Sequence, residues 1–193
     1  KPEYGYGLKK GIIPIFLAIA FTQYKDHIVV KRKNREYAPS AALLADIEFS
    51  PRDFKVVLEQ WDEDKDSYIA GLENIFAQYI SASDRAGGIF AYIVKAMCRW
   101  YLQLTKFEVT TKIVCEDNGA ISSMDTSALK YRNALSNSEI NAHEFLFKQL
   151  PNIFGATTLS DTLVRVRIAH QKITTTYRNL HIKFINEIKI LFG

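Results

Sequence analysis

The sequence predicts a mainly helical α+β chain, with a winged-helix-like N-terminal part followed by a helical bundle with a long C-terminal helix. Three observations support this fold class. Before residue 62, short β-rich runs and turn residues separate short helical segments. After residue 63, apolar residues recur every three or four positions, which is the spacing of one helix face. From Ser160 this spacing runs to Phe192 without a Pro or a Gly. We therefore expect two parts, at residues 1–62 and 63–193.

Two helices are expected in the N-terminal part. Residues 15–24 are apolar nearly all round, which predicts a buried helix with Pro14 in its first turn. A shorter helix is expected over residues 40–47, directly after Pro39 and with Ser40 as its N-cap. These helices flank the predicted strands.

Three strands complete the inventory of a winged helix. Residues 27–31 are β-rich, and residues 35–38 can pair with them through a tight turn at Lys33-Asn34. Apolar and polar residues alternate over residues 54–58, which favours a third strand, with a helix as the alternative.

The helical part is expected to contain four helices before the last one, over residues 64–79, 89–104, 123–135 and 142–150. A break is expected at residues 84–88 and a loop over residues 112–122, while Pro151 disturbs the fourth helix and Gly155 ends it. Ser160 is the expected N-cap of the last helix. Its apolar row needs packing partners, from a bundle within the chain or from a partner chain: Leu163, Val166, His170, Ile173, Tyr177, Leu180, Phe184 and Leu191.

Composition bounds the class of protein. The 193 residues include 25 Lys and Arg against 21 Asp and Glu, and only two Cys. Two Cys exclude a disulfide scaffold and a four-thiolate zinc site. The apolar run at residues 12–21 is too short to span a bilayer, which takes about 20 residues. We expect no membrane span and a cytoplasmic location.

The net charge of +4 conceals a pattern along the chain. Residues 1–36 carry eight Lys or Arg against three Asp or Glu, and residues 37–90 carry four against ten. Residues 91–193 carry thirteen against eight. The basic segments are candidates for an anionic partner such as DNA, although acidic and basic parts of one chain can also face each other.

Basic residues on the predicted hairpin are the candidate DNA contacts, because Lys and Arg on an exposed hairpin can release phosphate counterions. Charged hairpin tips also keep exposed strand edges soluble, which is the alternative. Arg167 and Arg178 add a basic edge to the last helix, beside His170 and His181. The full candidate set is Lys9, Lys10, Lys31, Arg32, Lys33, Arg35, Arg167 and Arg178.

The segment from Asp62 to Glu73 is similar to an EF-hand calcium loop. Asp62, Asp64 and Asp66 occupy loop positions 1, 3 and 5, and Glu73 occupies position 12. Ser67 stands where the loop needs Gly, and no second loop accompanies it. The alternative is an acidic turn that starts a helix.

No catalytic signature is present. The glycines do not have the spacing of a phosphate-binding loop, and there is no Gly-x-Ser-x-Gly elbow. Cys98 lies in an apolar helical pattern, and Cys115 lies beside two acidic residues that would blunt a thiolate. We expect neither catalysis nor a cofactor in these residues.

Three segments carry a resemblance to a family. Residues 6–14, with the sequence YGLKKGIIP, resemble a recurring segment of large bacterial ATP-binding proteins of phage-defence islands, including BREX-type ATPases. Residues 131–135 (YRNAL) and 145–151 (FLFKQLP), followed by Gly155, are similar to later stretches of the same proteins.

The resemblance implies a non-catalytic binding or coupling segment whose ATPase module lies outside this chain. A first residue of Lys1 instead of Met agrees with a piece of a longer protein. The implied partners are other domains of the parent protein, and DNA or a partner protein. A structural spacer that docks through its long helix is the alternative.

Overall fold

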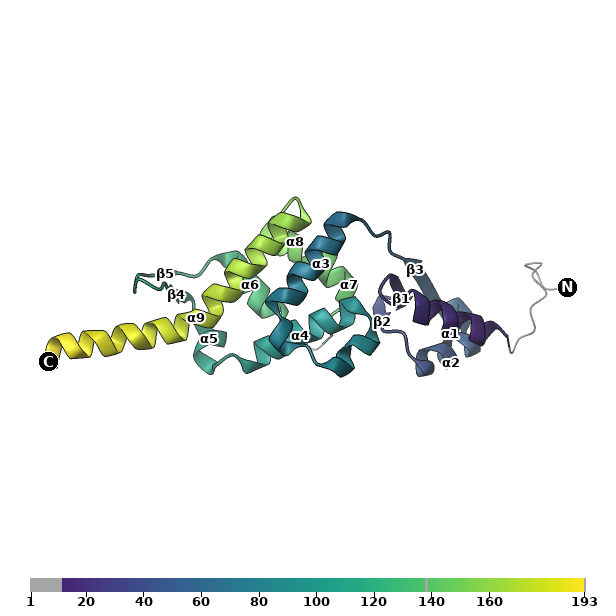
Figure 1. Ribbon diagram of the computed structural model, residues 1–193, viewed down its shortest axis with the longest axis horizontal. Helices are drawn as coiled ribbons and strands as arrows, with labels where there is room; N and C mark the ends of the chain where they lie inside the picture. The colour runs from purple at the N-terminus through teal and green to yellow at the C-terminus, as the bar shows by residue number, and fades with distance from the viewer. Residues whose placement is uncertain (1–11, 138, 193) are drawn as a thin grey trace.

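A computed structural model describes residues 12–137 and 139–192 of the chain. Within these residues the protein is mainly helical and elongated (Figure 1). A small unit of helices and strands lies at one end, a helical body lies in the middle, and the last helix projects at the other end. None of the described helices is long and apolar enough to cross a membrane.

The N-terminal unit has the element order helix, hairpin, helix, strand. Its sheet is antiparallel with the strand order β2-β1-β3. Val30 at the centre of β1 lies opposite Tyr37 on one side and Val56 on the other. The elements are α1 (Ile13–Gln23), β1 (Ile28–Arg32), β2 (Arg35–Tyr37), α2 (Ala41–Phe49), a 3-10 turn (Pro51–Asp53) and β3 (Phe54–Leu58).

The local signals explain these elements. Lys33 has a positive φ of 55° at the hairpin turn, and the Ser40 side chain accepts a hydrogen bond from the Leu43 amide at 3.2 Å. The strand prediction for residues 54–58 is confirmed. The helix prediction for residues 15–24 is also confirmed, but its predicted burial is wrong, since Phe21 is its one buried side chain.

Strand β1 belongs to two hydrophobic clusters because successive side chains of a strand point to opposite faces. Ile28 and Val30 pack with Phe21, Leu43 and Ile47 of α1 and α2. Val29, between them, belongs to the main core of the helical body. The sheet therefore lies between the two short helices and the helical body.

The helical body surrounds a central helix over residues 89–103, which contributes seven buried residues to the core. In chain order the elements of the body are α3 (Glu63–Ile75), 3-10 turns (Ala77–Tyr79 and Ala82–Gly87), α4 (Ile89–Gln103), α5 (Lys106–Thr110), β4 (Ile113–Cys115), β5 (Ile121–Ser123), α6 (Thr126–Ala134), α7 (Ala142–Glu144), a π-helical turn (Phe145–Gln149), α8 (Leu150–Phe154) and α9 (Leu159–Phe192).

Helix α9 crosses the body with its first half and leaves it with its second. Val166, Ala169 and Ile173 are buried in the core. Gly71 of α3 allows this approach, because a Cβ there would collide with the Leu163 side chain. From Ile182 onward all but one described residue is exposed. The predicted apolar row is thus covered within the chain over only about half of its length.

Two local predictions need correction. Residues 112–122 form the β4–β5 hairpin instead of a loop, with Gly119 at a φ of 79° in its turn. Thr158, not Ser160, accepts a hydrogen bond from the Asp161 amide at the start of α9. The predicted helix over residues 142–150 is α7, a π-helical turn and the start of α8, so it is irregular just before Pro151, as predicted; Pro151 itself lies in the first turn of α8, where its missing amide hydrogen costs little. Gly155 ends α8 in the left-handed conformation, as predicted.

Candidate functional site

The predicted basic hairpin exists, but most of its charge is paired. Three ion pairs use its cations: Lys31 with Glu36, Arg32 with Asp53 and Arg35 with Glu139. Lys33, at the turn, has no ion-pair partner within the described residues. A paired cation gains less by approaching a phosphate, because its own carboxylate must first be displaced.

The remaining candidate cations do not join the hairpin. Lys9 and Lys10 lie outside the described residues. Arg167 and Arg178 are exposed on α9, whose free half lies at the opposite end of the molecule from the hairpin (Figure 1). The six candidate residues that the structure describes therefore do not form one surface.

His170 packs against the core and is not a member of a basic edge. Its partly buried ring contacts the rings of Phe76 and Trp100, with centroid distances of 5.0 and 4.7 Å. Its Nε2 is buried without a hydrogen-bond partner within the described residues. Burial lowers the pKa of His170 from 6.5 to about 4, so the imidazole is neutral at pH 7.

The acidic segment is the start of a helix, not a calcium loop. Asp62 is the N-cap of α3 and accepts from the Lys65 amide at 2.9 Å. Asp66 accepts from the Trp61 indole, and Glu73 pairs with Arg85. A helix places Asp62 and Glu73 about 16 Å apart along its axis, so their carboxylates cannot surround one ion. In this structure the segment therefore has the geometry of a capped helix and not of an EF-hand loop.

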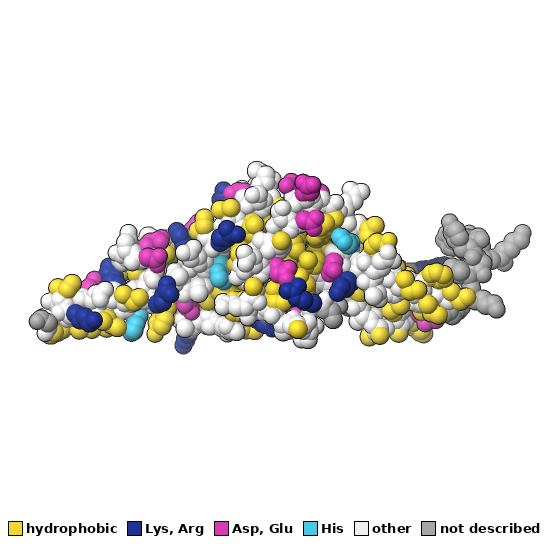
Figure 2. All heavy atoms as spheres, in the orientation of Figure 1, with side chains coloured by type: hydrophobic (Ala, Val, Ile, Leu, Met, Phe, Trp, Pro, Cys, Tyr) yellow, Lys and Arg dark blue, Asp and Glu magenta, His cyan; other side chains and the backbone are white. Residues whose placement is uncertain are grey.

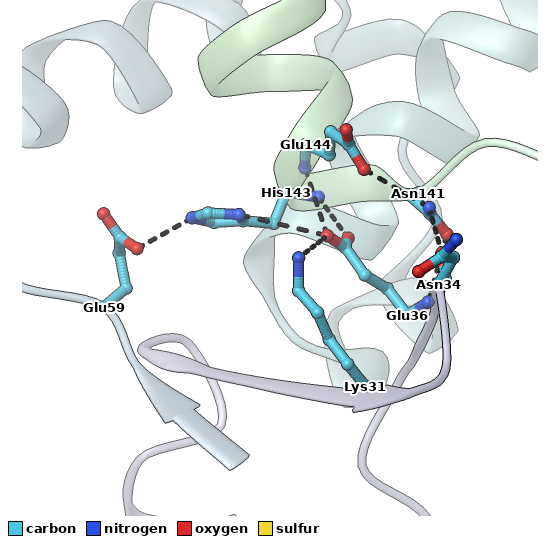
Figure 3. Close-up of polar contacts among 7 residues, drawn as sticks. All are labelled: Lys31, Asn34, Glu36, Glu59, Asn141, His143 and Glu144. Carbon is cyan, nitrogen blue, oxygen red and sulfur yellow. Dashed lines mark hydrogen bonds and ion pairs between the residues drawn. The ribbon is translucent and has the colours of Figure 1, made fainter. Parts of the chain in front are cut away.

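A polar cluster joins the hairpin to the helical body (Figure 3). The Glu36 carboxylate on β2 accepts from the backbone amides of His143 and Glu144, at 2.7 and 3.3 Å. Lys31 Nζ lies 3.1 Å from the same carboxylate, which is 8% exposed. Glu36 thus caps the first turn of α7 from a different part of the chain.

Asn141 completes the hairpin side of this polar cluster. Its side-chain oxygen accepts from the Glu36 amide at 3.0 Å, and its side-chain nitrogen donates to the Asn34 carbonyl at 2.7 Å. The Glu36 amide and the Asn34 carbonyl have no partner within the sheet, and the Asn141 side chain satisfies both of them. The hairpin is therefore fixed against α7.

His143 links a second carboxylate to the same cluster. Its Nε2 lies 2.8 Å from Glu59 Oε2, and Lys65 Nζ lies 2.6 Å from Glu59 Oε1. Burial raises the pKa of Glu59, but the hydrogen bonds from Lys65 and His143 outweigh burial and lower it. This part of the cluster therefore contributes stability above the ordinary Glu pKa and loses it as the pH falls.

Other buried polar groups have structural roles. Asp84 accepts from Lys95, Arg99 and Ser81, and these bonds hold the pKa of its carboxyl well below the usual range. Burial raises the pKa of the Cys98 thiol, which is the opposite of what a nucleophile needs. No group of three or more potential metal ligands occurs among the residues that the structure describes.

Helix α1 presents an exposed apolar face at the N-terminal end of the molecule. Ile12, Ile15, Phe16 and Ile19 follow helical spacing and are all exposed, with Ile15 at 59%. We call these four residues the α1 face. On its other side α1 packs on α2 and the sheet through Phe21. Soluble domains rarely leave such a stripe in water, so the α1 face is a candidate docking surface.

Helix α9 presents a second exposed apolar surface at the other end. Figure 2 shows hydrophobic side chains near both ends of the visible face. The surface on α9 lies within an arc of about 120° on the helix, by about 100° per residue. We call it the α9 arc, and it consists of Tyr177, His181, Phe184, Ile185, Ile188, Leu191 and Phe192.

Sequence reasoning predicted an apolar row that shares Tyr177, Phe184 and Leu191 with the α9 arc, but it placed His181 on a basic edge. It missed the polar cluster and the exposure of α1. The row from Leu163 to Leu191 showed at once that α9 needs partners. Glu36, Glu59 and His143 lie far apart in the sequence and match no motif, so no local signal could group them. The resembling segments 131–135 and 145–151 supply buried core residues, among them Tyr131, Leu146 and Leu150.

Comparison of the chain with protein-family models, with curated proteins and with solved structures found no match. The functional conclusion therefore rests on the residues of this chain.

Proposed function

We propose that this chain is a non-catalytic coupling segment of a larger ATP-dependent defence protein, and that it binds other protein segments. The observation that carries the proposal is the pair of exposed apolar surfaces, the α1 face and the α9 arc, at opposite ends of one packed body. A body with a docking surface at each end can hold two partners at a set separation.

The body between these two surfaces is suited to passing a displacement of one docked partner on to the other. A core that includes Trp100, Tyr131 and Phe76, each at most 1% exposed, resists deformation because protein interiors are close-packed. The polar cluster around Glu36 fixes the β1–β2 hairpin against α7 and so joins the N-terminal unit to the body. A displacement of α1 would therefore displace α9 by a similar amount, because the body between them deforms little.

A protein partner is favoured over DNA by the pairing of the hairpin cations. DNA affinity grows with the number of phosphates that free Lys and Arg neutralise. Three of the four hairpin cations have carboxylate partners, which leaves Lys33 as the one described hairpin cation without an ion pair. The order of helix, hairpin, helix and strand supports the winged-helix-like description, and we propose that this unit contacts protein.

The link to phage-defence ATPases depends on the three resembling segments. Two of them form part of the core of the helical body, and Arg132 donates to the Glu108 and Thr111 carbonyls at 2.8 and 2.7 Å. The proposal places the ATPase module elsewhere in the parent protein, which agrees with the missing phosphate-binding loop.

The first experiment separates a protein partner from DNA. A labelled DNA duplex is titrated with the chain at low salt, and fluorescence anisotropy reports binding for the wild type and for Lys33→Glu. We expect weak binding that disappears at physiological salt. Tight binding at physiological salt, lost in Lys33→Glu but not in the body variant Lys130→Glu, would overturn the preference for protein.

The second experiment uses the parent protein. We expect its gene to encode an ATPase module in the same reading frame as Lys1. Ile15→Ser combined with Ile19→Ser should leave ATP affinity unchanged and alter ATP turnover. Leu102→Ser is the matched control, because Leu102 is also exposed but lies on the helical body. A parent gene without an ATPase module would contradict the proposal.

A further inference from the structure

The α9 arc has the repeat of a helix that pairs with another helix. Tyr177, His181, Phe184, Ile188 and Leu191 follow steps of four, three, four and three residues. Such a 3-4 repeat keeps one seam of side chains facing a partner helix over several turns. Ile185 and Phe192 widen the seam on one side.

Tyr177, at the start of the seam, packs on Phe107 of α5 with ring centroids 5.9 Å apart. From His181 onward the seam residues are exposed. Asn179 donates to the Cys115 carbonyl at 2.9 Å, and Lys183 donates to the Gly119 carbonyl at 2.9 Å. These two residues bring the β4–β5 hairpin against α9, and Asn179 lies about 200° around the helix from Tyr177. The hairpin therefore covers the side opposite to the arc and does not compete for it.

The size of the arc matches what a specific dimer needs. Its six apolar side chains are between 37% and 85% exposed. Since a fully exposed aromatic side chain offers about 150–250 Å² and an aliphatic one somewhat less, the arc offers on the order of 600 Å² per copy. Specific protein interfaces bury about 800 Å² per partner, with a lower limit of about 600 Å².

We infer that the α9 arc is a self-association surface that pairs with the α9 arc of a second copy of this chain. The inference rests on the proposed function, in that it names the occupant of one docking surface. The arc contains no Lys, Arg, Asp or Glu, so two arcs can meet without burying a formal charge from those residues. The same patch serves both copies, as a two-fold interface requires.

A lipid surface is the competing occupant. The polar side of the free half carries Arg178, Lys183 and Lys189 against Glu187, and a basic amphipathic helix can lie on anionic lipid. Lys183 donates to the β4–β5 hairpin and lies 3.8 Å from Glu187, which leaves Arg178 and Lys189 as the two cations available to lipid. The 3-4 spacing of the seam favours a helix partner.

The test is the mass of the chain in solution, measured by sedimentation equilibrium over a range of chain concentrations. We expect a reversible dimer at tens of micromolar. Phe184→Ser removes two large side chains from each dimer and should raise the dissociation constant at least about 100-fold. Ile190→Ser is the matched control, because Ile190 is exposed on the same helix but lies outside the arc.

A variant with the opposite effect guards against a folding artefact. His181→Leu places an apolar side chain at the centre of the seam and should tighten the dimer several-fold. Circular dichroism of every variant should match the wild type, because these positions lie beyond the core. Opposite effects of the two substitutions would tie association to the seam.

Three outcomes would overturn the inference. The wild type could remain a monomer to about 0.5 mM, Ile190→Ser could weaken the dimer as much as Phe184→Ser, or the monomer could bind vesicles of anionic phospholipid through the arc. A monomer would leave the coupling role standing, since that role is judged by ATP turnover in the parent protein and by the α1 face.

Discussion

The buried His170 predicts a specific loss of stability in acid. In the folded chain its ring contacts the rings of Phe76 and Trp100, and its Nε2 is buried with no hydrogen-bond partner among the described residues. Burial lowers the pKa of His170 from 6.5 to about 4. The folded state therefore disfavours the imidazolium, while the unfolded chain accepts a proton at its ordinary pKa.

The sign and size of the effect follow from linkage. A lowered pKa means that the unfolded state binds more protons between pH 6.5 and pH 4, so stability falls as the pH falls through this window. The full difference corresponds to about 3 kcal/mol. At pH 4.5 most of it is expressed, about 2.5 kcal/mol.

The perturbation is His170→Gln, which keeps a neutral side chain of similar length and cannot titrate. Loss of the aromatic contacts should cost about 1 kcal/mol at pH 7. Urea denaturation at pH 7 and pH 4.5 then measures the free energy of unfolding of both proteins. We expect the wild type to be the more stable protein at pH 7 and His170→Gln to be the more stable at pH 4.5.

The other titratable groups change the free energy of unfolding equally in both proteins, so their contribution cancels when the two proteins are compared at the same pH. His181→Gln is the control, because it removes an exposed histidine of the same helix without touching the aromatic rings. A stability difference between wild type and His170→Gln that stays constant from pH 7 to pH 4.5 would refute the buried neutral imidazole.

Three further predictions concern single contacts. Gly88→Ala should destabilise the chain by about 2 kcal/mol in thermal melts, because Gly88 has a φ of 85° and a Cβ there would lie 2.9 Å from a backbone oxygen. Gly87→Ala is the control and should cost little, because a Cβ at Gly87 would meet open space. Arg132→Ala leaves two buried carbonyls unpaired and should cost about 3 kcal/mol in urea denaturation; a cost below 1 kcal/mol would contradict this role. Glu36→Ala should cost about 2 kcal/mol and speed hydrogen exchange at the start of α7, while Lys33→Ala should change neither.

The candidate site shows where sequence reasoning stops. The positions of Lys31, Arg32 and Arg35 on a hairpin were predictable from a β-rich run and a tight turn. Their pairing was not, because Asp53 and Glu139 lie 21 and 104 residues away from Arg32 and Arg35. A charge pattern along the chain shows which residues are basic, and the fold decides which of them stay available.

The sequence by itself determined the local elements of this protein. Alternation, turn residues, caps and a long 3-4 repeat act over a few residues, so they identified the hairpin, Ser40 as a cap, the end at Gly155 and the long last helix. The tertiary structure decided which apolar stripes are covered. It partly buried His170, left one face of α1 in water and covered only half of α9, because burial depends on which distant elements pack together and not on the stripe itself.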